Sequence, residues 1–194
     1  MMKLHKLRVL LLLAVMPVTV SVLSGCVAAV VGGAGTAVLV GEDRRTVGTV
    51  TEDQGIELKA TNRINDKFKD SHFNVTSYSR MVLITGEAAD AAMKTEIEKI
   101  VRAVENVRGV YNEMAIAGNT ALSARANDSY ITSKVKARFV DQQKFNPVHV
   151  KVVTEASVVY LLGLVKHKEA DDAVEITRTT SGVQKVVKLF EYLD

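Results

Sequence analysis

Residues 158–163 read VVYLLG, and this short apolar run ending in glycine decides the fold. Residues 81–86 read MVLITG, a run of the same kind that lies 163 − 86 = 77 positions earlier. Each run follows another extended segment, residues 73–78 in one case and residues 148–153 in the other. The β-branched content and the alternation of these segments favour strands that pair as hairpins. The chain therefore contains an internal repeat.

A helix is predicted on either side of each hairpin. The first helices show apolar residues at every fourth position, the spacing of a buried helical stripe. The two stripes are Ala60, Ile64 and Phe68 and, 131 − 60 = 71 positions later, Ile131, Val135 and Phe139. Second helices are expected over residues 89–105 and 168–179, and the first of them is about one turn longer. The last strand of each copy is expected to begin at a Gly-Val pair, Gly109-Val110 or Gly182-Val183. Each copy is then α+β, in the order helix-strand-strand-helix-strand, with a three-stranded mixed sheet packed by two helices.

The N-terminus is typical of a secretory signal. Residues 1–8 hold the basic residues Lys3, Lys6 and Arg8, and residues 7–23 are almost wholly apolar. This run contains Pro17 and is short for a permanent transmembrane helix. Residues 23–26, LSGC, resemble the lipobox of bacterial lipoproteins, which predicts cleavage before Cys26 and acylation of its thiol. The alternative is an ordinary signal followed by a chance cysteine. Cys26 is the one cysteine of the chain, so no internal disulfide can form.

The expected organisation has four parts. Residues 1–25 form the signal peptide, and residues 26–53 form an acylated cysteine with a flexible Gly/Ala-rich tether and a polar linker from residue 42. Residues 54–119 and 120–194 are the two repeated domains. Position 27 is valine, not the aspartate that resembles an inner-membrane retention signal. In a two-membrane host this predicts a lipid-anchored protein on the periplasmic face of the outer membrane.

The charge of the mature chain is balanced. The formal net charge of +3 comes from the three basic residues of the signal, so 25 − 3 = 22 basic residues face 22 acidic ones. This balance argues against bulk binding of nucleic acid. The two copies differ, because residues 52–119 hold 9 basic and 11 acidic residues, whereas residues 120–194 hold 11 basic and 9 acidic ones.

The repeat resembles the BON domain, and the whole chain resembles the dual-BON outer-membrane lipoproteins. The segments that carry the domain resemblance are VLITG (82–86), VRGV (107–110), VYLLGLV (159–165) and SGV (181–183). Those that carry the wider resemblance are CVAA (26–29), RTVGT (45–49), NVT (74–76), VYNE (110–113) and NDSYITSKV (127–135). The resemblance implies a non-catalytic protein that binds anionic phospholipid, supports envelope integrity and concentrates at division sites. It also implies that the second copy binds the lipid.

A stripe on the first helix of the second copy fits that role. Tyr130, Lys134 and Arg138 are spaced at every fourth position beside the apolar stripe, and Ser133 and Lys136 complete the predicted lipid-binding set. An amphipathic aromatic suits the bilayer interface, and basic residues suit an anionic leaflet. Tyr130 stands where the resembled family has tryptophan. Alignment on the apolar stripes places Lys59 of the first copy opposite Tyr130. The alternative is a solvated helix face.

Other functional classes find little support in the sequence. His72, His149 and His167 have no second ligand at metal spacing, so we expect surface histidines, no metal and no cofactor. No motif indicates an enzyme. Gly86, Gly163, Gly109 and Gly182 are interpreted as structural glycines. The alternative function is a periplasmic adaptor for outer-membrane protein assembly or cell-wall remodelling, and we expect a monomer.

Overall fold

The structure, a computed structural model, describes residues 43–69 and 71–194, and residues Asp43–Asp194 form one compact unit. The predicted signal peptide, the predicted acylation at Cys26 and the tether up to residue 42 lie outside the described residues. Among the described helices, none combines the length and the apolar character that crossing a bilayer requires.

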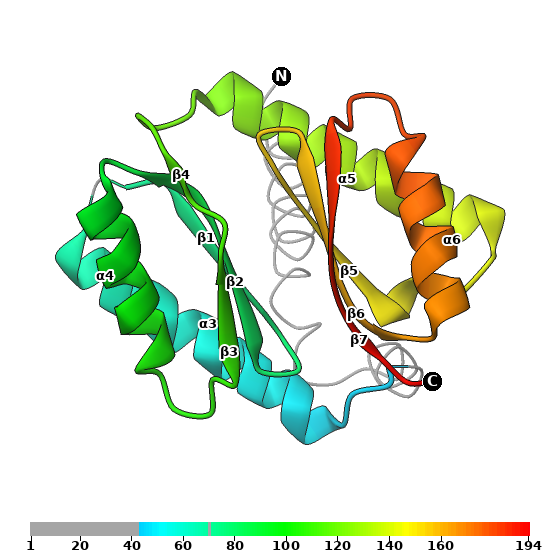
Figure 1. Ribbon diagram of the computed structural model, residues 1–194, viewed down its shortest axis with the longest axis horizontal. Helices are drawn as coiled ribbons and strands as arrows, with labels where there is room; N and C mark the ends of the chain where they lie inside the picture. Colours follow the sequence, from blue (N-terminus) through cyan, green and yellow to red (C-terminus); the bar gives the residue numbers. More distant parts are fainter. Residues whose placement is uncertain (1–42, 70) are drawn as a thin grey trace, which may run out of the picture. The chain divides into compact units, whose positions relative to one another are not determined.

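The first repeat, residues 47–116, contains two helices and a mixed sheet. Its elements are α3 (Val47–Lys67), β1 (Phe73–Tyr78), β2 (Met81–Ala88), α4 (Ala91–Arg102), β3 (Gly109–Asn112) and β4 (Ala115–Ile116). Strand β2 pairs antiparallel with β1 and parallel with β3, and the two-residue strand β4 pairs parallel with the end of β2. The helices α3 and α4 lie on one face of this sheet (Figure 1).

The second repeat, residues 122–192, has the same order. Its elements are α5 (Leu122–Gln142), the 3-10 turn η3 (Pro147–His149), β5 (Val150–Glu155), β6 (Val158–Val165), α6 (His167–Arg178) and β7 (Lys185–Tyr192). Strand β6 pairs antiparallel with β5 and parallel with β7, and α5 and α6 cover one face of the sheet (Figure 1). The predicted α+β class and the three-stranded mixed sheet of each repeat are therefore confirmed, and the short strand β4 adds to the first sheet.

Equivalent residues of the two first helices are farther apart in the sequence than the apolar pattern predicted. The buried residues are Asp53, Ile56, Ala60 and Ile64 in α3, and Asp128, Ile131, Val135 and Phe139 in α5. The offset is 128 − 53 = 75 positions, one helical turn more than the predicted 71. The polar linker predicted up to residue 53 is consequently wrong from Val47 onward, because α3 begins there. The apolar pattern predicted the wrong offset because the first buried residue of each helix is an aspartate, which such a pattern does not count.

Two further sequence predictions are wrong, one about the start of the last strands and one about the length of the second helices. Met81 pairs with Gly109 and Val158 pairs with Lys185, so the residue equivalent to Gly109 is Lys185, and Gly182 precedes the last strand. Gly182 (φ +98°) instead corresponds to Asn106 (φ 65°), since 182 − 106 and 185 − 109 are both 76. The helices α4 and α6 both have 12 residues, so the predicted extra turn is absent.

Each repeat turns its hairpin with two residues in the left-handed region. These residues are Ser79 (φ 51°), Arg80 (φ 65°), Ala156 (φ 48°) and Ser157 (φ 62°). Positive φ at both central positions is the geometry of a type I′ turn, which side chains other than glycine and asparagine adopt at a cost. Asp53 holds the first turn by accepting the N–H groups of Ser79 (2.9 Å) and Arg80 (2.7 Å). Asp128 holds the second in the same way, at 3.0 and 2.8 Å.

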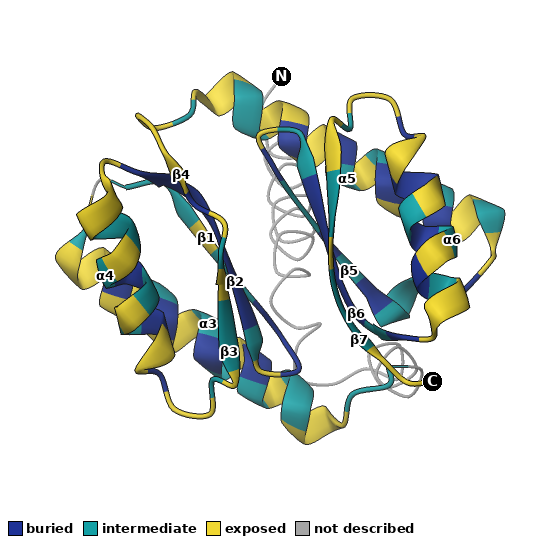
Figure 2. Cartoon of the chain, viewed as in Figure 1, coloured by how far each residue is buried: buried dark blue, intermediate teal, exposed yellow. Residues whose placement is uncertain are grey.

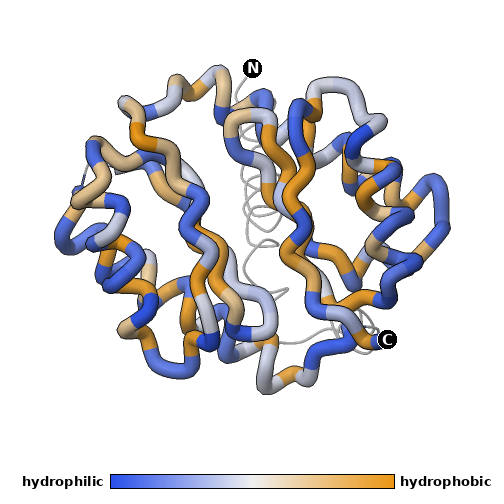
Figure 3. The backbone as a smooth tube through the Cα atoms, viewed as in Figure 1, coloured by the Kyte–Doolittle hydropathy of each residue, from blue (hydrophilic) through white to orange (hydrophobic). Residues whose placement is uncertain are grey.

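The central strands are buried on both faces, which explains their near-continuous apolar sequence. Val82 and Ile84 of β2 pack with the helices of the first repeat, whereas Leu83 on the opposite face belongs to another cluster. That cluster joins the two repeats, because it also contains Tyr160 and Leu162 of β6. Figure 3 shows the hydrophobic residues along the central strands of both repeats.

Polar contacts also connect the repeats. The Tyr78 hydroxyl donates to the carbonyl of His149 (3.3 Å), and Arg108 forms an ion pair with Glu191 (3.0 Å). These contacts and the shared apolar cluster hold the described chain together as one unit, so each small repeat gains buried area that it would lack alone.

Candidate functional site

The outer face of α5 exposes apolar side chains along its length. Leu122 is 79% exposed, and Tyr130 and Val140 are both 62% exposed. Ser133, which lies between them along the helix, is exposed as well. Figure 2 shows that exposed residues recur along α5. At 100° per residue these positions fall within one quarter of the helix surface, opposite the buried stripe. This surface, defined by Leu122, Tyr130, Ser133 and Val140, is called the outer face of α5 below.

Two residues of the predicted lipid-binding set are instead engaged inside the repeat. Arg138 donates to the carbonyl of Ile176 (2.8 Å) and to the hydroxyl of Thr180 (2.7 Å), and it thereby caps the C-terminal end of α6. Lys134 donates to the carbonyl of Ser181, and its ammonium lies 4.7 Å from the ring centre of Tyr130. Capping of helix carbonyls by cations is a stabilising contact.

The first repeat has cations at the two equivalent positions, and they contact the same region after its second helix. With the structural offset of 75, Lys134 corresponds to Lys59 and Arg138 corresponds to Arg63. Arg63 donates to the carbonyl of Ala103 (2.9 Å), and Lys59 pairs with Glu105 (3.2 Å), both just after α4. These cations therefore dock the two helices of each repeat, which gives Lys134 and Arg138 a structural role, and the lipid-binding role predicted for them stays a prediction.

The two repeats differ at the remaining positions of this surface. Tyr130 corresponds to Gly55, Lys136 to Thr61 and Val140 to Asn65. The aromatic and the extra cation are thus present in the second repeat alone, whereas exposed Leu122 and Ser133 correspond to Val47 and Leu58, which are exposed apolar residues of α3. The sequence prediction found Tyr130 and Lys136, but it missed Leu122 and Val140, whose exposure shows only when the core side of the helix is known.

An open hollow of about 450 Å³ lies beside the C-terminal part of α5. Its lining includes Lys136, Val140 and Asp43, the first described residue. The next residue, Arg44, donates two hydrogen bonds to Glu169 of α6 (2.6 and 2.8 Å). The start of the described chain is therefore held against the second repeat, next to the outer face of α5. Among the described residues, Lys136 has no ion-pair partner, so its charge is available at this surface.

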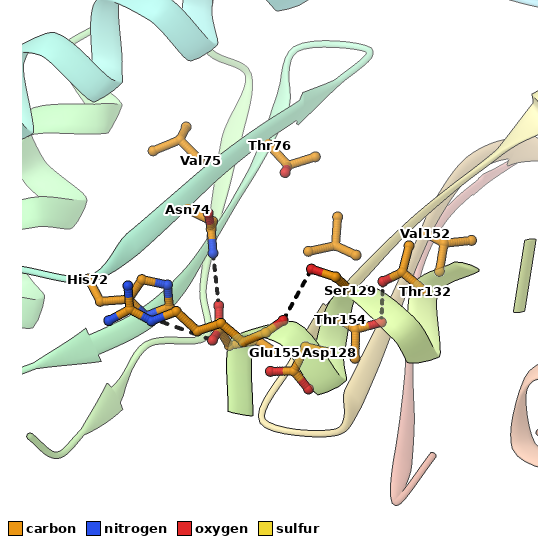
Figure 4. A pocket seen from close by; sticks show the side chains of 12 residues that line it. His72, Asn74, Val75, Thr76, Asp128, Ser129, Thr132, Val152, Thr154 and Glu155 are labelled. Atoms are coloured by element: carbon orange, nitrogen blue, oxygen red, sulfur yellow. Dashed lines mark hydrogen bonds and ion pairs between the residues drawn. The ribbon is translucent and has the colours of Figure 1, made fainter. Parts of the chain in front are cut away.

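A second polar cluster joins the two repeats. His72 precedes β1, Glu87 lies in β2, and Glu155 ends β5. The Nδ1 atom of His72 lies 2.9 Å from Oε2 of Glu87 and 3.9 Å from Oε1 of Glu155. Asn74 donates to Glu155 (3.0 Å), as Figure 4 shows at the edge of a pocket of about 410 Å³. The prediction that His72 is a surface histidine is wrong, because its side chain is only 12% exposed.

The carboxylate of Glu87 is stabilised in its charged form. Burial raises its pKa, but hydrogen bonds from Thr120 and His72 lower it, and the net pKa lies below the ordinary value. Thr120 supplies both its backbone N–H (3.1 Å) and its hydroxyl. Sequence reasoning missed this cluster because its members are separated by 87 − 72 = 15 and 155 − 87 = 68 positions.

The four structural glycines occupy different settings. A Cβ at Gly86 or Gly163 would come within 2.3 or 2.4 Å of a backbone carbonyl oxygen, so close strand approach requires glycine at both. At Gly109 a Cβ would meet only the end of the Met81 side chain. Gly182 needs its positive φ in the loop before β7.

Two copies of one helix-strand-strand-helix-strand unit, sharing an apolar interface, define a tandem α+β domain protein. Residues 52–118 and residues 127–194 each match the BON domain, and the chain belongs to the BON-domain family. It is a dual-BON protein, as the resemblance implied. This family has no known catalytic activity.

Several curated proteins are similar over most of their length. The outer membrane lipoprotein DolP of Haemophilus influenzae is 35% identical over 175 residues, which cover 89% of this chain and 91% of that protein. The 21 kDa hemolysin of Actinobacillus pleuropneumoniae is 27% identical, over 78% of this chain and 79% of the relative. The osmotically-inducible protein Y of Escherichia coli is 28% identical over 72% of each chain.

Proposed function

We propose that this protein is an outer-membrane lipoprotein, anchored through Cys26, whose second repeat docks on anionic phospholipid through the outer face of α5. The observation that carries the proposal is the difference between the repeats. Equivalent helices are docked by cations at equivalent positions, yet α5 carries Tyr130, Lys136 and Val140 at exposed positions where α3 carries Gly55, Thr61 and Asn65. Exposed apolar residues that the fold does not need, next to an unpaired cation, are typical of a surface that meets a membrane interface.

The chemistry of this surface suits weak and reversible binding. Tyrosine places an apolar ring and a polar hydroxyl at the level of lipid headgroups. A lysine near an anionic leaflet contributes on the order of 1 kcal/mol. These contributions are small for a free protein. They become effective for a protein already held at the membrane, because the anchor raises the local concentration of lipid headgroups around the second contact.

The position of Asp43, the first described residue, supports the same arrangement. Asp43 lines the hollow that Lys136 and Val140 also line. An acyl anchor on Cys26 is therefore connected, through the intervening residues, to the side of the second repeat that we assign to lipid. Similarity to the lipoprotein DolP supports the anchored outer-membrane location. Support of envelope integrity and concentration at division sites belong to the same proposal, as roles that the family resemblance implies.

The proposal predicts a charge-selective interaction with vesicles. The chain without its first 26 residues is titrated with vesicles of phosphatidylcholine, with and without phosphatidylglycerol, in a co-sedimentation assay. We expect binding that requires phosphatidylglycerol and weakens with salt. Tyr130→Glu should lower the affinity by about tenfold or more. The change removes the aromatic ring and adds a negative charge that the anionic lipid repels, and the two effects together are expected to cost about 1.4 kcal/mol of binding free energy.

The matched control lies on the first repeat. Leu58 is equivalent to Ser133 and is 63% exposed, so Leu58→Glu adds the same charge to an equivalent helix. We expect Leu58→Glu to bind vesicles like the unmodified chain. Equal binding to both vesicle types, or an equal loss in Leu58→Glu and Tyr130→Glu, would show that the outer face of α5 is not the lipid site.

A second candidate function is an adaptor that contacts outer-membrane protein assembly or cell-wall enzymes. The observation that favours it is a separate exposed apolar pair on α3, where Val47 is 64% and Leu58 is 63% exposed. A photo-crosslinker at position 58 that captures an assembly component in cells, with none captured from position 66 of the same helix, would support this function.

A further inference from the structure

We propose that His72, Glu87 and Glu155 form a binding site for a divalent transition-metal ion, with zinc the best match, that fixes the two BON repeats to each other. One imidazole nitrogen and one oxygen from each carboxylate lie within 4.8 Å of one another. Glu87 and Glu155 are buried, and His72 is partly buried. A histidine with two carboxylates is a ligand set that zinc uses in proteins.

The distances are close to those of a loaded site. Ligand atoms about 2.1 Å from a tetrahedral zinc ion lie about 3.4 Å from each other. Here the Nδ1 atom of His72 is 2.9 Å from Glu87 and 3.9 Å from Glu155. Side-chain movements of about 1 Å therefore place all three atoms around one ion.

The surroundings orient the ligands before an ion arrives. Thr120 donates to both carboxylate oxygens of Glu87, and Asn74 donates to Oε2 of Glu155, which leaves Oε1 near His72. Such hydrogen bonds to the ligands are the usual support of a protein metal site. Arg125 also lines the adjoining pocket, and its Nε donates to the carbonyl of Thr120 (3.1 Å) in the connection between the repeats.

The site has a mechanical consequence. His72 and Glu87 belong to the first repeat, whereas Glu155 ends the first strand of the second repeat. A bound ion would therefore link the repeats at the side of the apolar interface where the polar pocket lies. Zinc binding to the folded chain would raise its thermal stability, by about 5 to 10 °C at a free zinc concentration about 100 times the Kd.

The test uses full-length protein in mild detergent, with Cys26→Ser so that the single thiol cannot bind zinc. Isothermal titration with zinc chloride should show one bound ion per chain and a rise in melting temperature, whereas magnesium chloride should show neither. His72→Gln in the first repeat and Glu155→Gln in the second should each lower the zinc affinity by at least tenfold. Thr120→Ala, which removes a supporting hydrogen bond and no ligand, should lower it by about 10 to 100-fold.

The control is His167→Gln, because His167 is 63% exposed, pairs with Asp194 and is not a member of the cluster. It should keep the full zinc affinity. Circular dichroism of each metal-free variant shows that it is folded before titration. The proposal is overturned if the unmodified chain binds no zinc at millimolar concentration, or if folded His72→Gln and Glu155→Gln bind zinc as tightly as His167→Gln does.

Discussion

Replacing Asp53 with alanine is expected to lower the free energy of unfolding by about 3 to 5 kcal/mol, because it breaks a buried ion pair and orphans several donors. Asp53 is 3% exposed and accepts the hydroxyl of Ser77 (2.6 Å) and the N–H groups of Ser79 and Arg80. It also pairs with Arg45 (3.0 Å). Urea unfolding followed by circular dichroism measures the change.

Two controls make this prediction specific. Asp66→Ala removes the same side chain from an exposed position of the same helix, and it should change stability by no more than about 0.5 kcal/mol. Asp128→Ala removes the equivalent turn contacts of the second repeat, but Asp128 forms no ion pair with any described residue. Its cost should therefore be smaller than that of Asp53→Ala. Equal stability of Asp53→Ala and Asp66→Ala would refute the role assigned to Asp53.

The second large effect is expected for Gly86→Ala, which should destabilise the chain by about 2 to 6 kcal/mol through backbone strain and overpacking combined. Gly86 has φ +110°, and a Cβ there would lie 2.3 Å from the carbonyl oxygen of His72 and 2.7 Å from the Cα of Phe73. Both are backbone atoms, one just before strand β1 and one at its first residue, so neither can rotate away. Differential scanning calorimetry of the variant measures the loss.

Gly55→Ala provides the opposite result in the same repeat. Gly55 lies within α3, and a Cβ there would meet nothing within 4 Å. Alanine is about 1 kcal/mol more favourable than glycine inside a helix, so this variant should be more stable than the unmodified chain. A Gly86→Ala variant that melts at or above the unmodified temperature would contradict the strand geometry described here.

The sequence predicted the fold because strand alternation and the glycine-ended runs are local signals. It misplaced the first helix by one turn because a buried aspartate looks like a linker residue when its partners are unknown. Asp53 is satisfied by Ser79 and Arg80, which lie 79 − 53 = 26 and 80 − 53 = 27 positions away. Hydrogen bonds between residues so far apart in the sequence cannot be predicted from hydrophobic periodicity.

The same limit applied to the candidate site. Helical spacing grouped Tyr130, Lys134 and Arg138, but it could not show that Arg138 donates hydrogen bonds to the C-terminal end of α6. The structural alignment of the repeats resolved this, because Arg63 makes the equivalent contact in the first repeat. Comparing the two copies thus separates residues that hold the repeat together from residues that are added on its outer face.

The outer face of α5 and the anchor at Cys26 have complementary roles in the proposed function. The anchor provides lasting attachment, so the folded contact can remain weak enough to respond to the lipid composition beneath it. The first repeat presents Gly55 where the second presents Tyr130, and Thr61 where the second presents Lys136. It can therefore share the membrane anchor without competing for the lipid.

The most direct test is to measure which repeat touches the bilayer. In a Cys26→Ser background, an environment-sensitive fluorophore is attached to a cysteine at position 133 or at the equivalent position 58, which leaves Tyr130 in place. On phosphatidylglycerol vesicles the probe at position 133 should shift its emission to the blue and become protected from an aqueous quencher, while the probe at position 58 should remain in water. Equal burial of both probes, or burial of the probe at position 58 alone, would contradict lipid docking by the second repeat.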